Sequence, residues 1–159
     1  MTMRLTRMAR WISTLSFCVA YAGGAILHAQ AASMTGIWQE PSGAVLRVDR
    51  CGSQICIWIA MLSPHADAPT DIHNPDASLR GRALCGLEIG TAFTLRDATH
   101  ATDGTLYDPK TGKTYHGMMT AADGKLDLRG YIGVPLFGRS QAWTRPARPV
   151  KACAAAPGD

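Results

Sequence analysis

Short segments in which apolar and polar residues alternate recur along the sequence from residue 36 onward, and turn-forming residues separate them. Residues 125–131, for example, alternate leucines with charged residues, which places the two kinds of side chain on opposite faces of a strand. No window longer than about ten residues keeps the apolar spacing of a helix. The pattern therefore predicts an all-β domain.

Eight segments have this strand-like character. They are residues 36–40, 44–50, 55–62, 87–96, 105–108, 114–121, 125–131 and 137–145. Two turns are clear between them, because proline presets the first corner of residues 109–112 and Asp123-Gly124 is a strong hairpin signal. Residues 63–82 are rich in Pro, Asp, His and Asn, which indicates a long loop with one helical turn at residues 76–80. Residues 55–62 are apolar on both faces, so we expect something to cover their outer side.

The two ends of this domain carry residues that are expected to meet. Trp38 lies in the first predicted strand and Arg145 ends the last. In an up-and-down barrel these strands are neighbours, so the Arg145 guanidinium would lie over the Trp38 indole, a contact of about 0.5–2 kcal/mol. The alternative is a core tryptophan and an unrelated surface charge. Because a closed barrel leaves no exposed sheet edge, we predict a small antiparallel up-and-down barrel of about eight strands, similar to a lipocalin.

A segment with the three-part pattern of a secretory signal precedes the first strand. Its first ten residues carry three arginines and no acidic residue, an apolar run follows over residues 11–27, and small Ala29 and Ala31 close it. The alternative is an uncleaved membrane anchor, because the run approaches the ~18–20 residues of a span. We expect cleavage after Ala31, no membrane span afterwards, and a periplasmic or secreted protein. The predicted division is signal peptide 1–31, barrel domain 32–146 and C-terminal tail 147–159.

Net charge changes little about this picture. The whole sequence has 16 Lys and Arg against 12 Asp and Glu. Three of the arginines lie in the predicted leader, so the remaining chain is nearly neutral. Because its basic residues form no cluster, we expect no binding to nucleic acid.

Four cysteines remain after the leader: Cys51, Cys56, Cys85 and Cys153. An even number in a small exported domain indicates disulfide bonds, for which three pairings exist. A turn-sized spacer separates Cys51 from Cys56, which favours their pairing across a hairpin and leaves Cys85 with Cys153. The alternative is a zinc site, but the spacing lacks two short Cys-x-x-Cys pairs and an oxidising compartment disfavours free thiolates.

Several blocks resemble the bacterial family known as domain of unknown function 2147. They are DIHNPD (71–76), LRGR (79–82), LCGL (84–87), YDP (107–109), GKTY (112–115), GYIG (130–133) and residues 137–145. The likeness spans about residues 35–145 and implies an exported protein with a lipocalin-like barrel. It implies no reaction and no catalytic residues. The sequence departs from the family in the cysteine-bearing tail beyond Arg145 and in Gly81, and the tail leaves the family's disulfide pattern open for this chain.

The long predicted loop holds a candidate metal site. His65, Asp67, Asp71 and His73 lie within nine residues, and imidazole and carboxylate groups are ordinary ligands of zinc and copper. Aspartates in proline-rich loops also cap turns, so we expect no metal here. Structural roles are expected instead for Asp71, Asn74, Arg80 and Arg82. Ion pairs and backbone hydrogen bonds of these residues would hold the loop over one barrel end.

Two hypotheses about function follow. The sequence has no Gly-x-Ser-x-Gly motif and no recognisable catalytic triad, so we expect neither an enzyme nor a cofactor. The first hypothesis is a carrier of a small, mostly apolar ligand, bound in the barrel. Its expected cavity residues are Trp58, Tyr107, Tyr115, Met118, Tyr131 and Phe137. The alternative is a structural or protein-interaction module of the cell envelope with a filled barrel. We make no prediction of oligomeric state.

Overall fold

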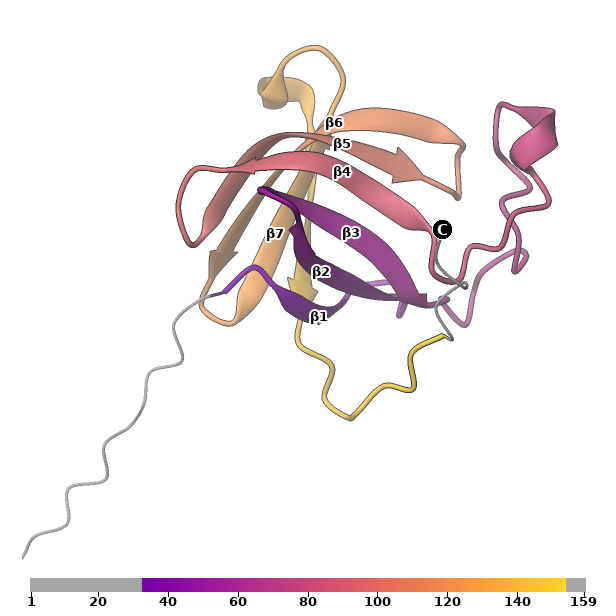
Figure 1. Ribbon diagram of the computed structural model, residues 1–159, viewed down its shortest axis with the longest axis horizontal. Coiled ribbons are helices and arrows are strands. Elements are labelled where there is room, and N and C mark those ends of the chain that lie inside the picture. The colour runs from indigo at the N-terminus through magenta and orange to yellow at the C-terminus, as the bar shows by residue number, and fades with distance from the viewer. Residues whose placement is uncertain (1–32, 154–159) are drawn as a thin grey trace, which may run out of the picture. The chain divides into compact units, whose positions relative to one another are not determined.

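The computed structural model describes residues 33–153. In this range eight strands form one closed antiparallel barrel in which neighbours in sequence pair and β1 meets β8 (Figure 1). The strands are β1 (Gly36–Gln39), β2 (Val45–Cys51), β3 (Gln54–Met61), β4 (Glu88–Leu95), β5 (His100–Asp108), β6 (Lys113–Ala122), β7 (Lys125–Tyr131) and β8 (Arg139–Thr144). Two short 3-10 turns, η1 (Ala77–Leu79) and η2 (Pro135–Phe137), lie in loops. The all-β, antiparallel up-and-down barrel of about eight strands that the sequence predicted is confirmed. No helix within the described residues is both long and apolar enough to span a membrane.

Local sequence explains most of these elements. In β7 the leucines point inward and are buried, whereas the charged residues between them lie outside. The β6–β7 hairpin has only two turn residues, Asp123 and Gly124, with φ of 49° and 72°. Positive φ at both positions is what a type I′ turn requires, which explains why Asp-Gly stands there.

Strand β5 is longer than predicted. It begins at His100 instead of Thr105, and Asp103-Gly104 lies at an irregularity within the strand. The register with β6 shifts between Ala101 and Gly104, and Asp103 has a φ of 61°. A bulge of this kind bends the strand while pairing continues on both sides.

Large side chains fill the barrel interior. Trp38, Phe93 and Trp143 are 1%, 0% and 2% exposed. A side chain that lines a cavity large enough for water keeps accessible surface, so these rings contact other side chains instead. The Phe93 ring lies directly against the backbone of Gly104 and Gly117, where an added Cβ would be 2.3 Å and 2.7 Å from ring atoms. The interior around Phe93 is therefore tightly packed.

Arg145 closes the barrel where the first and last strands meet. Its guanidinium lies 3.5 Å from the centre of the Trp38 ring, and it donates hydrogen bonds to the carbonyl oxygens of Ser33, Thr35 and Ile37. Gly36 leaves room for this group, because a Cβ there would lie 2.5 Å from a guanidinium nitrogen. Burial lowers the pKa of Arg145 below its ordinary value. One side chain therefore ties the last strand to the first.

The tail after β8 covers the outer face of β1, β2 and β3. Residues 146–153 run across these strands, and the Cys153 N–H donates to the carbonyl of Ala60 at 2.6 Å. A disulfide bond joins Cys153 to Cys85, and a second joins Cys51 to Cys56, the pairing that the sequence favoured. This cover accounts for the apolar Ala60 on the outer face of β3, while the Arg47 guanidinium lies over Trp58 on the same face.

Candidate functional site

The six side chains expected to line a cavity do not come together. Trp58 lies on the outer face of β3, where the Arg47 guanidinium sits 4.3 Å from its ring centre. Met118 also points outward, because its neighbours Gly117 and Met119 are both buried and successive side chains of a strand point to opposite faces. Phe137 belongs to η2 instead of the last strand and is 79% exposed. For these three residues the expected inward position is therefore wrong.

The three tyrosines occupy three different environments. Tyr115 points inward near one barrel end, where it lies beside Gly130 and Leu106. Tyr131 lies on the outer face, with its ring centre 5.5 Å from that of His116. Tyr107 packs under the long loop. Only Tyr115 has the orientation that a ligand inside the barrel would need.

Four side chains anchor the long loop between β3 and β4 through a buried carboxylate. Asp71 is completely buried and accepts hydrogen bonds from the Tyr107 hydroxyl, the Asn74 amide and the Arg82 guanidinium at 2.7–2.9 Å. Arg82 also forms an ion pair with Asp71 at 2.8 Å. Every buried side-chain nitrogen or oxygen atom in the described range has at least one hydrogen-bond partner. This arrangement holds the loop to β5.

These contacts set the charge of the network. Burial alone would raise the pKa of Asp71, but the hydrogen bonds from Asn74, Tyr107 and Arg82 together bring it below the ordinary value of 3.8. Burial raises the pKa of Tyr107, and its hydrogen bond to Asp71 raises it further. Asp71 is therefore a carboxylate and Tyr107 a neutral donor at neutral pH.

Further contacts brace the same loop. Arg80 donates to the carbonyl of Asn74 at 2.8 Å, and the Asp76 carboxylate caps η1 by accepting from the Ser78 N–H. The loop also touches the β5–β6 turn, because a Cβ on Gly112 would lie 2.1 Å from the carbonyl oxygen of His73. Asp71, Asn74, Arg80 and Arg82, the residues expected to have structural roles, thus all take part in holding this loop.

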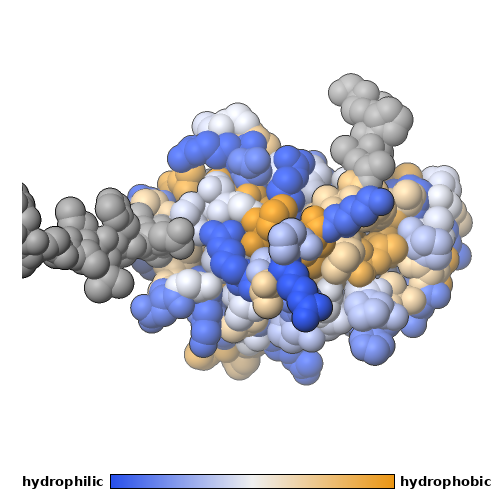
Figure 2. Space-filling view, turned by 90° about the horizontal axis from the view of Figure 1, so that it is seen from below, coloured by the Kyte–Doolittle hydropathy of each residue, from blue (hydrophilic) through white to orange (hydrophobic). Residues whose placement is uncertain are grey.

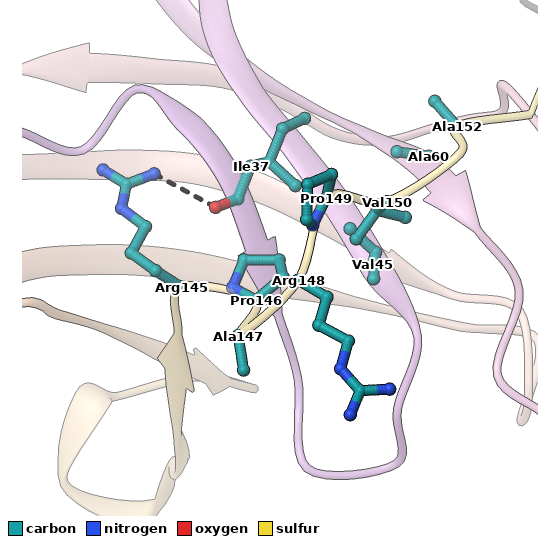
Figure 3. Close-up of a pocket in the computed structure, with 10 residues that line it drawn as sticks. All are labelled: Ile37, Val45, Ala60, Arg145, Pro146, Ala147, Arg148, Pro149, Val150 and Ala152. Atoms are coloured by element: carbon teal, nitrogen blue, oxygen red, sulfur yellow. Dashed lines mark hydrogen bonds between the residues drawn. The ribbon is translucent and has the colours of Figure 1, made fainter.

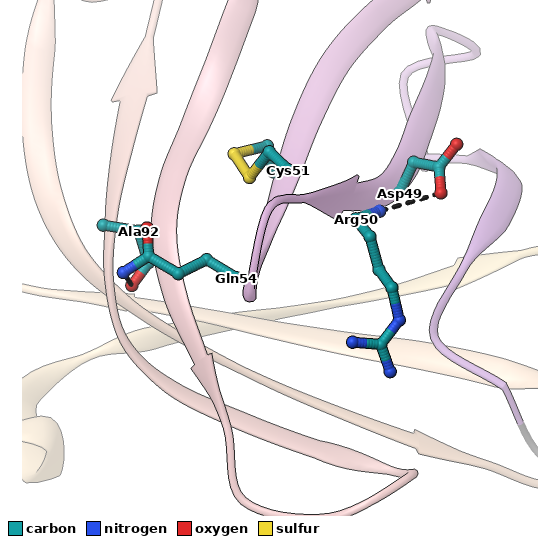
Figure 4. The surroundings of a disulfide bond; sticks show 6 residues. Asp49, Arg50, Cys51, Gln54 and Ala92 are labelled. Carbon is teal, nitrogen blue, oxygen red and sulfur yellow. Dashed lines mark hydrogen bonds between the residues drawn. A yellow bond between two sulfur atoms is a disulfide. The ribbon is translucent and has the colours of Figure 1, made fainter.

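The candidate metal ligands of this loop point in different directions. His73 lies 3.5 Å from Asp67 in an exposed pair, while Asp71 faces Arg82 on the other side. Among the described residues, one group of three potential ligands is close enough to share an ion: Cys51, Cys56 and Glu88. The two sulfurs of that group are bonded to each other (Figure 4) and are not thiolates.

The most exposed large apolar side chains of the described surface lie in the loop between β7 and β8. We call residues 132–137 the apolar loop. Its exposed members are Ile132 (68%), Val134 (52%), Leu136 (80%) and Phe137 (79%). The loop projects away from the strands, with η2 at its tip (Figure 1). Single exposed apolar residues are ordinary on a protein surface, but four within six positions indicate a contact surface.

Hydrogen bonds from β7 hold the backbone of the apolar loop in place. The Arg129 guanidinium on β7 donates to the carbonyl oxygens of Pro135, at 2.7 and 2.9 Å, and of Leu136, at 3.2 Å. Gly138 then returns close to β7, because a Cβ there would lie 2.8 Å from the Gly130 carbonyl. Arg129 thereby fixes the loop conformation that leaves its side chains outside.

A second surface feature lies under the tail. A cleft of about 430 Å³ separates residues 146–152 from the outer face of the barrel (Figure 3). Its floor is formed by Ile37, Val45 and Ala60, with Arg145 at one side. Seen from the tail side, apolar residues lie in the centre of this face between hydrophilic ones (Figure 2). This cleft and a second one, beside Glu40 and Ala142, lie outside the barrel interior.

Comparison with known proteins places these features in a family. The family model described as "Uncharacterized protein conserved in bacteria (DUF2147)" matches residues 36–145, from the start of β1 to Arg145. The chain belongs to this family. The matched region holds the barrel, the Asp71 network and the apolar loop of this DUF2147 protein, while the tail that carries Cys153 lies beyond it. A comparison with curated proteins found no match.

A solved structure has the same fold. Its title is "Protein HP1028 from the human pathogen Helicobacter pylori belongs to the lipocalin family", and it matches with a TM-score of 0.67 and 18% sequence identity. The match covers 73% of the DUF2147 chain and 84% of the other. At this identity the likeness shows the lipocalin-like fold alone.

The two disulfide bonds give information about the cellular compartment of the protein. Disulfide bonds persist in oxidising compartments outside the cytoplasm, and the family is bacterial, so this protein has the features of an extracytoplasmic one. The predicted signal peptide, residues 1–31, lies outside the residues that the structure describes.

Proposed function

We propose that this protein is an interaction module of the bacterial cell envelope, in which a filled barrel presents the apolar loop to another envelope component. The observation that carries the proposal is the exposure of Ile132, Val134, Leu136 and Phe137 on one short loop. In an isolated soluble protein such a cluster lowers solubility, so its presence favours a surface that is covered in the working state.

The interior favours this function over that of a carrier. A ligand inside the barrel would need space in the hydrophobic core that Trp38, Phe93 and Trp143 now help to fill. Of the aromatic residues expected around such a ligand, Tyr115 alone points inward. The proposal includes export to the periplasm or beyond, with cleavage after Ala31, because the disulfide bonds suit that environment.

Site-specific photo-crosslinking in living cells tests the proposal. A photoreactive residue replaces Leu136, which is 80% exposed in the apolar loop, and in a matched control it replaces Ser53, which is exposed in the β2–β3 turn. These positions lie at opposite ends of the barrel by the strand order. We expect covalent adducts with an envelope component from position 136 and none from position 53. Equal or absent labelling from position 136 would contradict the proposal.

A further inference from the structure

We infer that the partner of the apolar loop is a phospholipid bilayer with anionic headgroups, into whose interface Leu136 and Phe137 insert. This inference rests on the proposed function and names the partner class. Three features of the loop support it: its backbone hydrogen bonding, its shape and the charge around it.

Several backbone polar groups near the tip form hydrogen bonds inside the protein. Arg129 donates to the carbonyls of Pro135 and Leu136, the Phe137 N–H donates to the carbonyl of Val134, and the Gly138 N–H donates to that of Pro135. Pro135 itself has no N–H. Unpaired backbone groups make an irregular chain costly in an apolar medium, so these bonds lower the cost of placing the loop in a membrane interface.

The shape suits a bilayer better than a protein partner. A stable protein interface takes roughly 20–30 residues from each side, with matched contours. The apolar loop offers six residues on a projecting tip. A bilayer requires no matched contour, because its interface accepts any exposed apolar side chain and contributes in proportion to the area buried.

Charge favours anionic headgroups. Residues 128–141, which include the apolar loop and its base, contain two arginines and no carboxylate side chain. Arg129 lies opposite Ser140 and Arg139 lies opposite Gly130, at the base of the loop where β7 pairs with β8. Basic residues beside an inserted apolar group add attraction to anionic lipid and make the binding sensitive to salt.

Vesicle flotation with the exported, disulfide-bonded protein tests the inference. The vesicles contain phosphatidylethanolamine and phosphatidylglycerol, and pure phosphatidylcholine vesicles serve for comparison. We expect the protein to float with the anionic vesicles and to be released by high salt. The double substitution Leu136→Ser and Phe137→Ser should weaken binding at least about tenfold, because most of the exposed apolar area is removed. Phe137→Trp should keep binding within about twofold, because tryptophan favours membrane interfaces.

A matched control removes apolar groups from the other loop at the same barrel end. Ile72→Ser with Leu79→Ser, at positions that are 42% and 39% exposed, should leave vesicle binding within about twofold, because the area lost is smaller and lies outside the apolar loop. Failure of the unmodified protein to bind, or equal binding by the Leu136/Phe137 variant, would overturn the inference. If position 136 then crosslinks to a protein in cells, the proposed function stands and the bilayer is the wrong partner. If it crosslinks to nothing, both fail.

Discussion

Asp71 is the single residue on which the long loop depends most. It is fully buried, and its carboxylate accepts hydrogen bonds from Tyr107, Asn74 and Arg82. Asp71→Asn keeps the size of the side chain but removes the negative charge opposite Arg82. It also places an amide N–H group toward groups that themselves donate hydrogen bonds. We expect the free energy of unfolding to fall by about 2–4 kcal/mol, measured by urea denaturation. Asp67→Asn, which breaks an exposed pair with His73, should cost less than about 0.5 kcal/mol. Equal losses would contradict the assigned role.

The same residue gives a pH dependence with a definite sign. Because the folded protein lowers the pKa of Asp71 below 3.8, its contribution to stability is complete above that value and is lost as the pH falls through the folded-state pKa. The stability of the unmodified protein should therefore decrease more steeply below about pH 4 than that of Asp71→Asn. Urea midpoints measured through this range check the difference, and parallel curves would count against it.

Substitution of Gly104 tests how tightly the barrel interior is packed, because it adds a single methyl group there. An added methyl group would lie 2.3 Å from the Phe93 ring, which is completely buried and has no room to withdraw. We expect Gly104→Ala to lower the free energy of unfolding by about 1–3 kcal/mol in thermal or urea unfolding. Gly81→Ala is the matched control, because nothing lies within 4 Å of the added atom and its effect should be near zero. A neutral Gly104→Ala would mean that the interior has space.

At the scale of elements, the tail is held by one covalent bond and one backbone hydrogen bond at its end. The Cys85–Cys153 bond joins residues 68 positions apart, whereas Cys51–Cys56 spans 5. In the loop-entropy description the longer closure restricts the unfolded chain more, by about 4 kcal/mol against about 2. Replacing Cys85 and Cys153 by serine should therefore destabilise the protein more than replacing Cys51 and Cys56. Urea unfolding of the two variants measures this, and the reverse order would refute it.

The strands were predictable because their signal is local. Alternation along residues 125–131 specifies β7 without reference to the rest of the chain, and Asp123-Gly124 specifies its hairpin. The start of β5 at His100 was missed because the strand-like pattern breaks at Asp103-Gly104, where the strand contains a bulge. Phe137 was assigned to a strand although Gly133, Pro135 and Gly138 interrupt the pattern around it, and these breaks were the available sign of a loop.

The candidate site was less predictable than the strands. Residue type does not say which face of a strand a side chain occupies, and a shift of one position exchanges the faces. Met118 and Met119 are chemically identical, yet Met119 is buried in the core and Met118 lies outside. Trp58 was expected inside because it is aromatic, but its register with Arg47 places it on the outer face. The exposure of the apolar loop depends on tertiary structure, because Arg129 holds it from a different element.

At the scale of the whole molecule, the two barrel ends differ. Arg145 and Trp38 close the barrel where the first and last strands meet, and the long β3–β4 loop and the apolar loop both extend from the other end. Between them lies an interior filled by side chains from all eight strands. This division places binding at the surface of the loop-bearing end instead of inside the barrel.

Native mass spectrometry of the protein isolated from its own cells tests this central claim most directly. We predict the mass of residues 32–159 with two disulfide bonds and no retained small molecule, because Phe93, Trp38 and Trp143 occupy the space that a ligand would need. A species heavier by the mass of a small apolar compound, lost on unfolding and retained by the Leu136→Ser, Phe137→Ser variant, would show that the barrel interior binds a ligand and would contradict the account.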